Sequence, residues 1–241
     1  MLNLSFSCGD YELTRPLIDG LVKAKGIELN CIILSSPERH WRMSRYQEFD
    51  ICEFSLSSYL IAKVKKMNFT AIPVFPHRRF RNAFIFINNQ KGIKNPKDLE
   101  GKRIGLRTLQ NTAGLWVRGI LQNYYEVSLS DISWFTQDEE PISLPYSLKL
   151  SIQRVPSGKN LDTMLSVGEL DAVIYPETIP SFKSGNPNVE RLFKDYKKEE
   201  INYYKKTEIF PIMHTVVIKD EILQQHPWVA TNMLEAFCEA K

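Results

Sequence analysis

A cationic cluster between two apolar runs is the first feature of this sequence that suggests chemistry. The stretch from residue 71 to residue 88 reads AIPVFPHRRFRNAFIFIN. It gathers four basic residues around Phe80, namely His77, Arg78, Arg79 and Arg81. Guanidinium groups bind carboxylates through paired, charge-assisted hydrogen bonds. We interpret the stretch as a crossing from one lobe to another, so the cluster indicates a site for a small anion there. An ordinary solvated loop is the alternative, because runs of like charge usually lie on the surface.

Three residues are candidates for moving a proton: His214, Asp10 and Glu53. His214 lies in the apolar run IFPIMHTVVI, and an imidazole titrates in the range that suits proton transfer at neutral pH. Asp10 and Glu53 lie at the ends of strand-like runs, where open α/β sheets place their ligands. A satisfied core histidine and carboxylates paired with arginine are the structural alternatives.

Two predicted helix starts are further candidates for binding an anion. Ser57 and Ser58 begin a predicted helix, with Ser55 as its N-cap. Thr112 begins another, which runs to about residue 124. The free N–H groups and the dipole at a helix N-terminus favour anions. Simple helix capping is the alternative for each of these residues.

Several common site types are absent from the sequence. It contains no glycine-rich dinucleotide fingerprint, no phosphate-binding loop, no HExxH motif and no GxSxG elbow. The four cysteines and four histidines show no metal-ligand spacing, so we predict reduced thiols and no metal site. A net charge of +3, with basic residues scattered among acidic ones, gives no reason to expect a nucleic-acid partner.

The order of predicted elements is typical of an α/β protein. Through residues 1–75, strand-like runs at 2–8, 27–34 and 49–54 alternate with predicted helices over 13–21, 36–46 and 56–66. This order favours a parallel sheet with right-handed crossovers. A second alternation of the same kind ends near residue 175, and Pro176 follows it. We therefore predict two α/β lobes, with a ligand cleft between them. Lobe 1 would hold residues 1–81 and 176–241, and lobe 2 residues 82–175.

The two ends of the sequence give expectations about its cellular setting. Met1 leads almost directly into a strand-like run, without the pattern of a signal peptide. No apolar run approaches the roughly 18 residues that a membrane span needs. We therefore expect a cytoplasmic protein with no membrane partner. The last residues follow a helical pattern that has no closing signal, so we expect the natural chain to continue past Lys241.

Five sequence strings together resemble one family of enzymes. In chain order they are CGDYELTRPLIDG, WRMSRYQEFDICEFSLSSYL, AIPVFPHRRFRNAFIFIN, NTAGLWVRGIL and IFPIMHTVVI. They resemble the 4,5-dihydroxyphthalate decarboxylase family, which is similar in fold to the type II periplasmic binding proteins. The resemblance covers essentially the whole chain. It implies a two-lobe α/β fold and a carboxy-lyase that degrades an aromatic compound.

The resemblance also implies a reaction that needs no cofactor. Each carboxylate of 4,5-dihydroxyphthalate has a ring hydroxyl para to it, so the ring itself takes up the electrons. The site then needs cations for the carboxylates, a base at the phenol and an acid at the ring. Arg78 and Arg81 are expected to bind the carboxylates, with Ser57, Ser58 and Thr112 as polar anchors. His214, Asp10 and Glu53 are the acid and base candidates, and His77 is given no catalytic role.

A protein that binds without chemistry is the rival hypothesis. A solute-binding protein of an ABC-type transporter, or a ligand sensor, would use the same cleft for a small aromatic or sulfonate anion. The partner in either case is a small anionic aromatic molecule, and a homo-oligomer is possible. Release of CO₂ from 4,5-dihydroxyphthalate distinguishes the two hypotheses.

Overall fold

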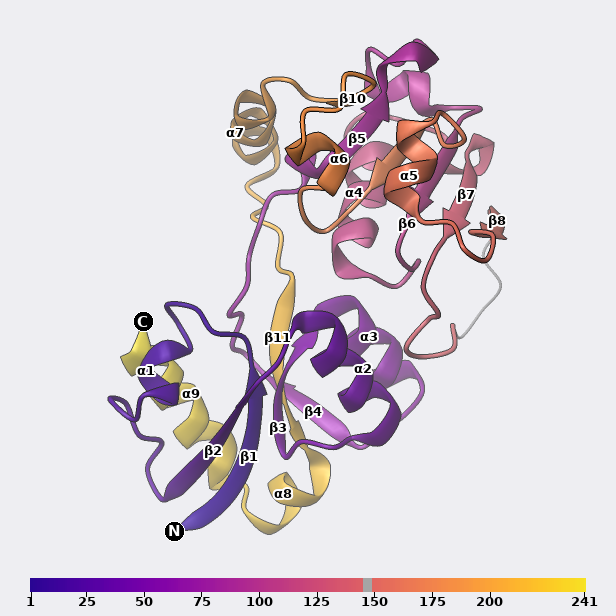
Figure 1. Cartoon of the computed structure of the whole chain (residues 1–241). Helices are drawn as coiled ribbons and strands as arrows, with labels where there is room; N and C mark the ends of the chain where they lie inside the picture. Colours follow the sequence, from indigo (N-terminus) through magenta and orange to yellow (C-terminus); the bar gives the residue numbers. More distant parts are fainter. Residues whose placement is uncertain (145–148) are drawn as a thin grey trace. The chain divides into compact units, whose positions relative to one another are not determined.

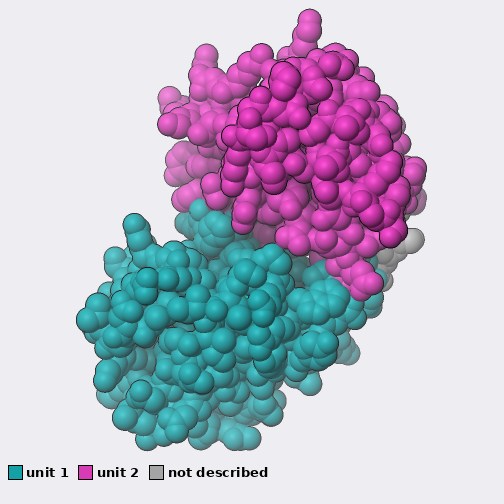
Figure 2. All heavy atoms as spheres, viewed as in Figure 1, with its two compact units in different colours: residues 1–78, 141–145, 212–241 teal, residues 79–140, 146–211 magenta. Residues whose placement is uncertain are grey.

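The protein folds into two compact units, which Figure 2 colours separately. A computed structural model describes residues 1–144 and 149–241. Unit 1 consists of residues 1–78, 141–145 and 212–241, and unit 2 of residues 79–140 and 146–211. Each unit has its own mixed sheet and its own helices (Figure 1). The two-lobe fold class predicted from the sequence is therefore confirmed.

Unit 1 is built on a five-stranded sheet with the order β2-β1-β3-β11-β4. Its strands are β1 (Leu2–Cys8), β2 (Ile27–Ile33), β3 (Ile51–Ser55), β4 (Phe69–Ile72) and β11 (His214–Lys219). Strands β1, β2 and β3 pair in parallel, as the alternating pattern predicts. Strand β11 is different, because it arrives from the end of the chain and pairs antiparallel with both β3 and β4.

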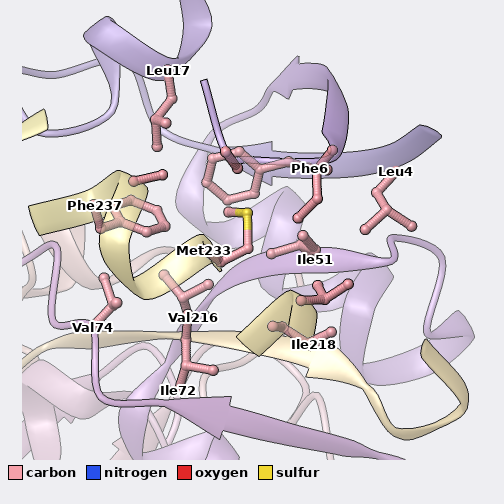
Figure 3. Close-up of a cluster of buried hydrophobic side chains, with 14 of the residues drawn as sticks. Leu4, Phe6, Leu17, Ile51, Ile72, Val74, Val216, Ile218, Met233 and Phe237 are labelled. Carbon is pink, nitrogen blue, oxygen red and sulfur yellow. The ribbon is translucent and has the colours of Figure 1, made fainter. Parts of the chain in front are cut away.

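Helices cover both faces of this sheet (Figure 1). They are α1 (Arg15–Ile18), α2 (Ser36–Tyr46), α3 (Leu56–Val64), α8 (Asp220–Gln225) and α9 (Trp228–Ala240). On one face, Leu17 of α1 and Met233 and Phe237 of α9 pack on Phe6 and other strand residues (Figure 3). Met43 of α2 and Ala62 of α3 belong to a second core, which includes Cys52 and Phe54 of β3. Successive residues of β3 thus point to opposite faces, because Ile51 joins the first core whereas Cys52 and Phe54 join the second.

Unit 2 has a six-stranded sheet with the order β10-β5-β9-β6-β7-β8. Its strands are β5 (Ile85–Asn88), β6 (Arg103–Leu106), β7 (Ser133–Thr136), β8 (Ser151–Arg154), β9 (Ala172–Ile174) and β10 (Val189–Arg191). Strands β9, β6, β7 and β8 pair in parallel, whereas β5 is antiparallel to both of its neighbours. The helices are α4 (Thr112–Asn123), α5 (Leu161–Ser166), α6 (Pro180–Lys183) and α7 (Tyr196–Thr207).

The predicted lobe boundaries need one correction. The first crossing, expected near residues 76–82, lies between residues 78 and 79. The second was expected near residue 176, but residues 176–211 belong to unit 2 and not to lobe 1. The reason is that the elements after Pro176 pack on unit 2. Strand β10 pairs with β5 at the edge of its sheet, and α7 packs on the short helix Asn82–Phe84. A short segment around Ile142 also belongs to unit 1, where Ile142 joins the core beneath α2 and α3.

Most other elements lie where the sequence predicts them, with ends that differ by a few residues. Two elements are shorter than predicted. The helix expected over 13–21 forms only one turn, Arg15–Ile18, and the strand expected over 209–218 begins only at His214. Neither α6 nor β10 was predicted. None of the helices in the described ranges is long and apolar enough to cross a membrane.

Candidate functional site

The strand order of unit 1 brings three distant segments to one edge of its sheet. Gly9 directly follows β1, Glu53 lies near the carboxyl end of β3, and His214 opens β11. Because β11 runs antiparallel to β3, its first residue pairs with the last residue of β3, so His214 lies opposite Ser55. Residues that are 161 positions apart in the sequence therefore meet at this edge.

A carboxylate and an imidazole form the centre of the site. Nδ1 of His214 lies 2.5 Å from Oε1 of Glu53. The Glu53 side chain is 1% exposed and that of His214 is 11% exposed, so water does not screen the contact. An ionised carboxylate only accepts hydrogen bonds, so Nδ1 of His214 donates, and Nε2 is the nitrogen left for a ligand. This is the arrangement by which a carboxylate orients a catalytic histidine.

A buried arginine holds the other oxygen of the same carboxylate. Nη2 of Arg39, on α2, lies 2.9 Å from Oε2 of Glu53. The backbone N–H of Gly9 donates to this oxygen as well, at 2.9 Å. Arg39 also donates from Nε to the Glu53 carbonyl and from Nη1 to the Leu34 carbonyl. Its guanidinium is therefore committed to the protein and serves to fix Glu53.

These contacts keep Glu53 ionised despite its burial. Burial alone would raise the pKa of the carboxyl group. The hydrogen bond with His214, the charge of Arg39 and the Gly9 N–H outweigh burial and hold the pKa of Glu53 well below its usual range. Glu53 is thus a permanent anion at physiological pH and is not itself a proton donor.

A cavity of about 530 Å³ opens beside this pair, and all of its lining residues belong to unit 1. A volume of this size is typical of sites for small organic ligands. Its lining includes Glu53 and His214 together with Asp10, Tyr11, Ser36 and His77. The Tyr11 ring lies against Gly9 so closely that a Cβ there would be 2.7 Å from the ring, so a glycine is needed at position 9.

Two further imidazoles flank His214. The ring centroids of His40 and His77 each lie 4.8 Å from that of His214, in edge-to-face contacts. Burial, and then the neighbouring His214, lower the pKa of His40, so His40 stays neutral. The carbonyl of His77 accepts hydrogen bonds from the N–H groups of Met213 and His214, which fixes the start of β11.

The structure brings the three predicted proton-transfer residues together. His214, Glu53 and Asp10 all line the cavity. Asp10 forms an ion pair with Arg15 at 2.9 Å, and both side chains are substantially exposed. Pairing with arginine was the alternative that we gave for both carboxylates. Asp10 pairs with Arg15, and Glu53 pairs with Arg39, a partner that the sequence did not suggest.

The predicted anion-binding residues are distributed over both units. In unit 1, Ser57 and Ser58 are buried at the start of α3, where the Ser58 N–H donates to Ser55 Oγ at 3.4 Å. Arg78 is exposed, and its backbone bridges to Ile212. Arg81 and Thr112 lie in unit 2. Thr112 is buried in the first turn of α4.

Arg81 has a structural partner within its own unit. It is buried, and its Nη1 donates to the Pro176 carbonyl at 2.9 Å. Burial, and then the nearby Arg79, lower the pKa of Arg81 to about 10, so it remains charged at neutral pH. This arginine therefore supports the chain at Pro176, whatever else it binds.

Sequence reasoning gave no role at the site to Tyr11 or Arg39, and it gave no catalytic role to His77, which it placed in the basic cluster. Tyr11 follows Asp10 in the turn after the first strand, so its place in the turn was a usable signal. Arg39 gave no signal, because an arginine in a helix rich in charged residues resembles a surface side chain. Within the described ranges, no group of three or more His, Cys, Asp or Glu side chains is arranged to hold a metal ion.

Comparison of the sequence with curated proteins identifies two close relatives. A protein from Comamonas testosteroni described as 4,5-dihydroxyphthalate decarboxylase is 38% identical over 247 residues, covering 100% of this chain and 75% of the relative. A second, from Pseudomonas putida and described in the same words, is 37% identical over 211 residues, covering 85% of this chain and 82% of the relative. No family model matches the sequence.

Solved structures show the same fold at low sequence identity. The periplasmic aliphatic sulphonate binding protein SsuA from Escherichia coli matches with a TM-score of 0.60 and 13% identity, over 99% of this chain and 72% of that one. The desulfurization enzyme DSZB matches with a TM-score of 0.54 and 14% identity, over 100% of this chain and 75% of that one. The fold thus occurs both in a binding protein and in an enzyme.

Proposed function

The chain belongs to the 4,5-dihydroxyphthalate decarboxylase family, and from that premise we propose that it converts 4,5-dihydroxyphthalate into 3,4-dihydroxybenzoate and CO₂. The observation that carries this proposal is the Glu53–His214 pair at a cavity large enough for a single aromatic ring. The reaction needs a general base, and we assign that role to this pair.

His214 is the general base in this proposal. Its Nε2 takes the proton from the ring hydroxyl para to the carboxylate that leaves. The electron pair of the broken O–H bond moves into the ring and raises the electron density at the carbon that bears this carboxylate. Glu53, which is ionised and bonded to Nδ1, stabilises the imidazolium that forms and keeps the ring in place.

An acid then protonates the ring carbon, and the bond to the carboxylate breaks. The electron pair of that bond returns to the ring, which becomes aromatic again as CO₂ leaves. The phenoxide takes its proton back from His214, so the net reaction consumes one proton. We assign the acid to His77, because it lines the cavity and its ring contacts that of His214. Asp10 lines the cavity too, but it is exposed and paired with Arg15.

The carboxylates of the substrate need cations, and this requirement gives the arginines their proposed role. Arg78 is exposed and adjacent to His77 in the chain, so it is our main candidate in unit 1. Ser57 and Ser58, buried at the start of α3 in the same unit, are the proposed polar anchors. Arg81 and Thr112 belong to unit 2, and their part in binding stays a prediction from the sequence.

Substitution of His214 tests the proposal directly. In His214→Asn, the affinity for 4,5-dihydroxyphthalate should stay within a few fold, whereas turnover should fall by about 10²- to 10⁴-fold, the usual share of general acid–base catalysis. Affinity is measured by calorimetry and turnover by release of CO₂. His226→Asn is the matched control, because His226 lies in unit 1 at the end of α8 and away from the cavity. Normal turnover in correctly folded His214→Asn would refute the assigned role.

Ligand binding without chemistry is the second candidate function. The structural similarity to a periplasmic sulphonate-binding protein supports it. Wild-type protein that binds the diacid but releases no CO₂ from it would decide in favour of this candidate.

A further inference from the structure

The hydroxyl group of Tyr11 is a feature of the cavity that the proposed mechanism does not use. Tyr11 lines the same cavity as Glu53 and His214. Its hydroxyl oxygen is buried and has no hydrogen-bond partner of normal geometry among residues 1–144 and 149–241. A buried polar group without a partner is rare in folded proteins, and near a cavity it points to a ligand or to bound water.

The Tyr11 side chain stands on a rigid turn. Thr14 Oγ1 donates to the Gly9 carbonyl at 2.6 Å and accepts from the Tyr11 N–H at 3.2 Å. The Tyr11 carbonyl accepts from the N–H groups of Thr14 and Arg15, both at 2.9 Å. Together with the close packing of the ring on Gly9, these hydrogen bonds hold the Tyr11 side chain, and with it the hydroxyl group, in one position.

Tyr11 is a donor at any physiological pH. Burial, and then the charge of Glu53 and the approach of its carboxylate to the hydroxyl, raise the pKa of Tyr11 far above the ordinary value, although no hydrogen bond of normal geometry joins the two groups. The carboxylate of Glu53 already accepts from His214, Arg39 and Gly9. A ligand oxygen in the cavity is therefore a good acceptor for the Tyr11 proton.

The charges around the cavity decide which end of a ligand fits here. Among its charged lining residues, Glu53 is paired with Arg39, and Asp10 is paired with Arg15. The cavity thus presents hydrogen-bonding groups to a ligand, and its one lining guanidinium is already bound by the protein. A donor hydroxyl on Tyr11 and an accepting nitrogen on His214 complement two adjacent phenolic groups, one that accepts a hydrogen bond and one that gives up its proton.

We propose that Tyr11 donates a hydrogen bond to one catechol oxygen of the ligand while His214 takes the proton of the other, so that the cavity selects ortho-dihydroxy aromatic acids. This inference rests on the proposed function for the identity of the ligand, but it concerns binding and can be tested without turnover. Tyr11 then acts as a specificity-determining residue.

Binding of benzoates by wild-type protein and by Tyr11→Phe tests the proposal. The probes are 3,4-dihydroxybenzoate and 4-hydroxybenzoate, which differ by one hydroxyl group, and affinity is measured by calorimetry. Wild-type protein should prefer the dihydroxy compound by about 10-fold or more, since an unpaired buried donor is costly. In Tyr11→Phe this preference should fall to about 2-fold or less. Tyr46→Phe is the control, because Tyr46 is 71% exposed at the end of α2, and it should retain the wild-type preference.

Each result has a definite meaning. Wild-type protein that binds both compounds equally, or neither, overturns the proposal even if Tyr11→Phe fails to fold. A preference that survives in Tyr11→Phe with an unchanged melting temperature overturns it too. A preference that depends on Tyr11, in a protein that releases no CO₂ from 4,5-dihydroxyphthalate, supports the proposal while refuting the decarboxylase function.

Discussion

Replacing Glu53 with glutamine should strongly destabilise unit 1, because it removes one charge from a buried ion pair. The substitution keeps the size of the side chain but leaves the Arg39 guanidinium, 1% exposed, without its counter-ion at 2.9 Å. Glu53 also loses its charged contacts with Gly9 and His214. Removing one partner of a buried pair typically costs about 3–5 kcal/mol. We expect the free energy of unfolding to fall by about that amount at pH 7.

The difference between wild type and Glu53→Gln should depend on pH in a definite direction. The folded protein holds the pKa of Glu53 below its value in the unfolded chain. The unfolded chain therefore binds the proton more readily, and Glu53 contributes its full stability above an unfolded pKa of about 4.3. That contribution is lost as the pH falls from there toward the folded pKa. The advantage of wild type should thus be constant from pH 7 to about pH 5 and shrink below it.

Urea unfolding at several pH values measures this difference, with hydrogen exchange to assign the loss to a unit. Peptides from β1, β3 and β11 should lose protection in Glu53→Gln, whereas those from β6 and β9 should not, because those strands belong to unit 2. Glu48→Gln is the matched control, since it breaks a surface pair with Arg42, and exposed pairs of this kind contribute little to stability. A loss in Glu53→Gln no larger than that of the control, or one independent of pH down to pH 3, would refute the reasoning.

Five other substitutions have expected outcomes. His77→Gln should lower turnover by about 10²-fold and change the pH profile of kcat, with affinity nearly unchanged, if His77 supplies the proton to the ring carbon; an unaltered kinetic profile would remove it from the mechanism. Arg78→Ala should weaken dicarboxylate binding by about 1.5–3 kcal/mol in calorimetry. Arg81→Ala should instead lower the melting temperature, because Arg81 donates a hydrogen bond to the Pro176 carbonyl. Gly9→Ala should weaken ligand binding measured by calorimetry, since the new Cβ would lie 2.7 Å from the Tyr11 ring. Gly105→Ala should destabilise unit 2 by about 1–3 kcal/mol in urea unfolding, because its Cβ would meet side chains of Leu161 and Leu170 at 2.5 and 2.7 Å. The same substitution should leave ligand binding to unit 1 intact.

The sequence predicts the fold well because most of its elements carry local signals. Strand β1 and helix α2 begin and end at the predicted residues, and Ser55 caps α3 as expected. The boundary at residue 176 was wrong because proline marks a break in an element but says nothing about which sheet the next strand joins. Strand β10 is only three residues long, Val189–Arg191, and a short edge strand leaves almost no periodicity to read.

The site was predictable only in part. Asp10 and Glu53 were chosen because they lie at strand ends, where ligands bind, and His214 because an imidazole suits proton transfer; the structure places all three at one cavity. The sequence did not predict that His214 would contact Glu53, because this contact depends on the pairing of β11 with β3. Arg39 and Tyr11 acquire their roles from burial, and one sequence does not show which polar side chains the fold will bury.

The position of β11 has a consequence for how the protein is made. β11 lies between β3 and β4, yet it is synthesised after the whole of unit 2. While the ribosome adds the 141 residues from 79 to 219, the facing edges of β3 and β4 have no partner in their final sheet. At ordinary rates of translation this interval is on the order of 10 s. Unpaired apolar strand edges promote aggregation. Unit 2 can therefore fold before unit 1 is complete, and the N-terminal strands complete their sheet, and with it the Glu53–His214 pair, only after β11 has been made.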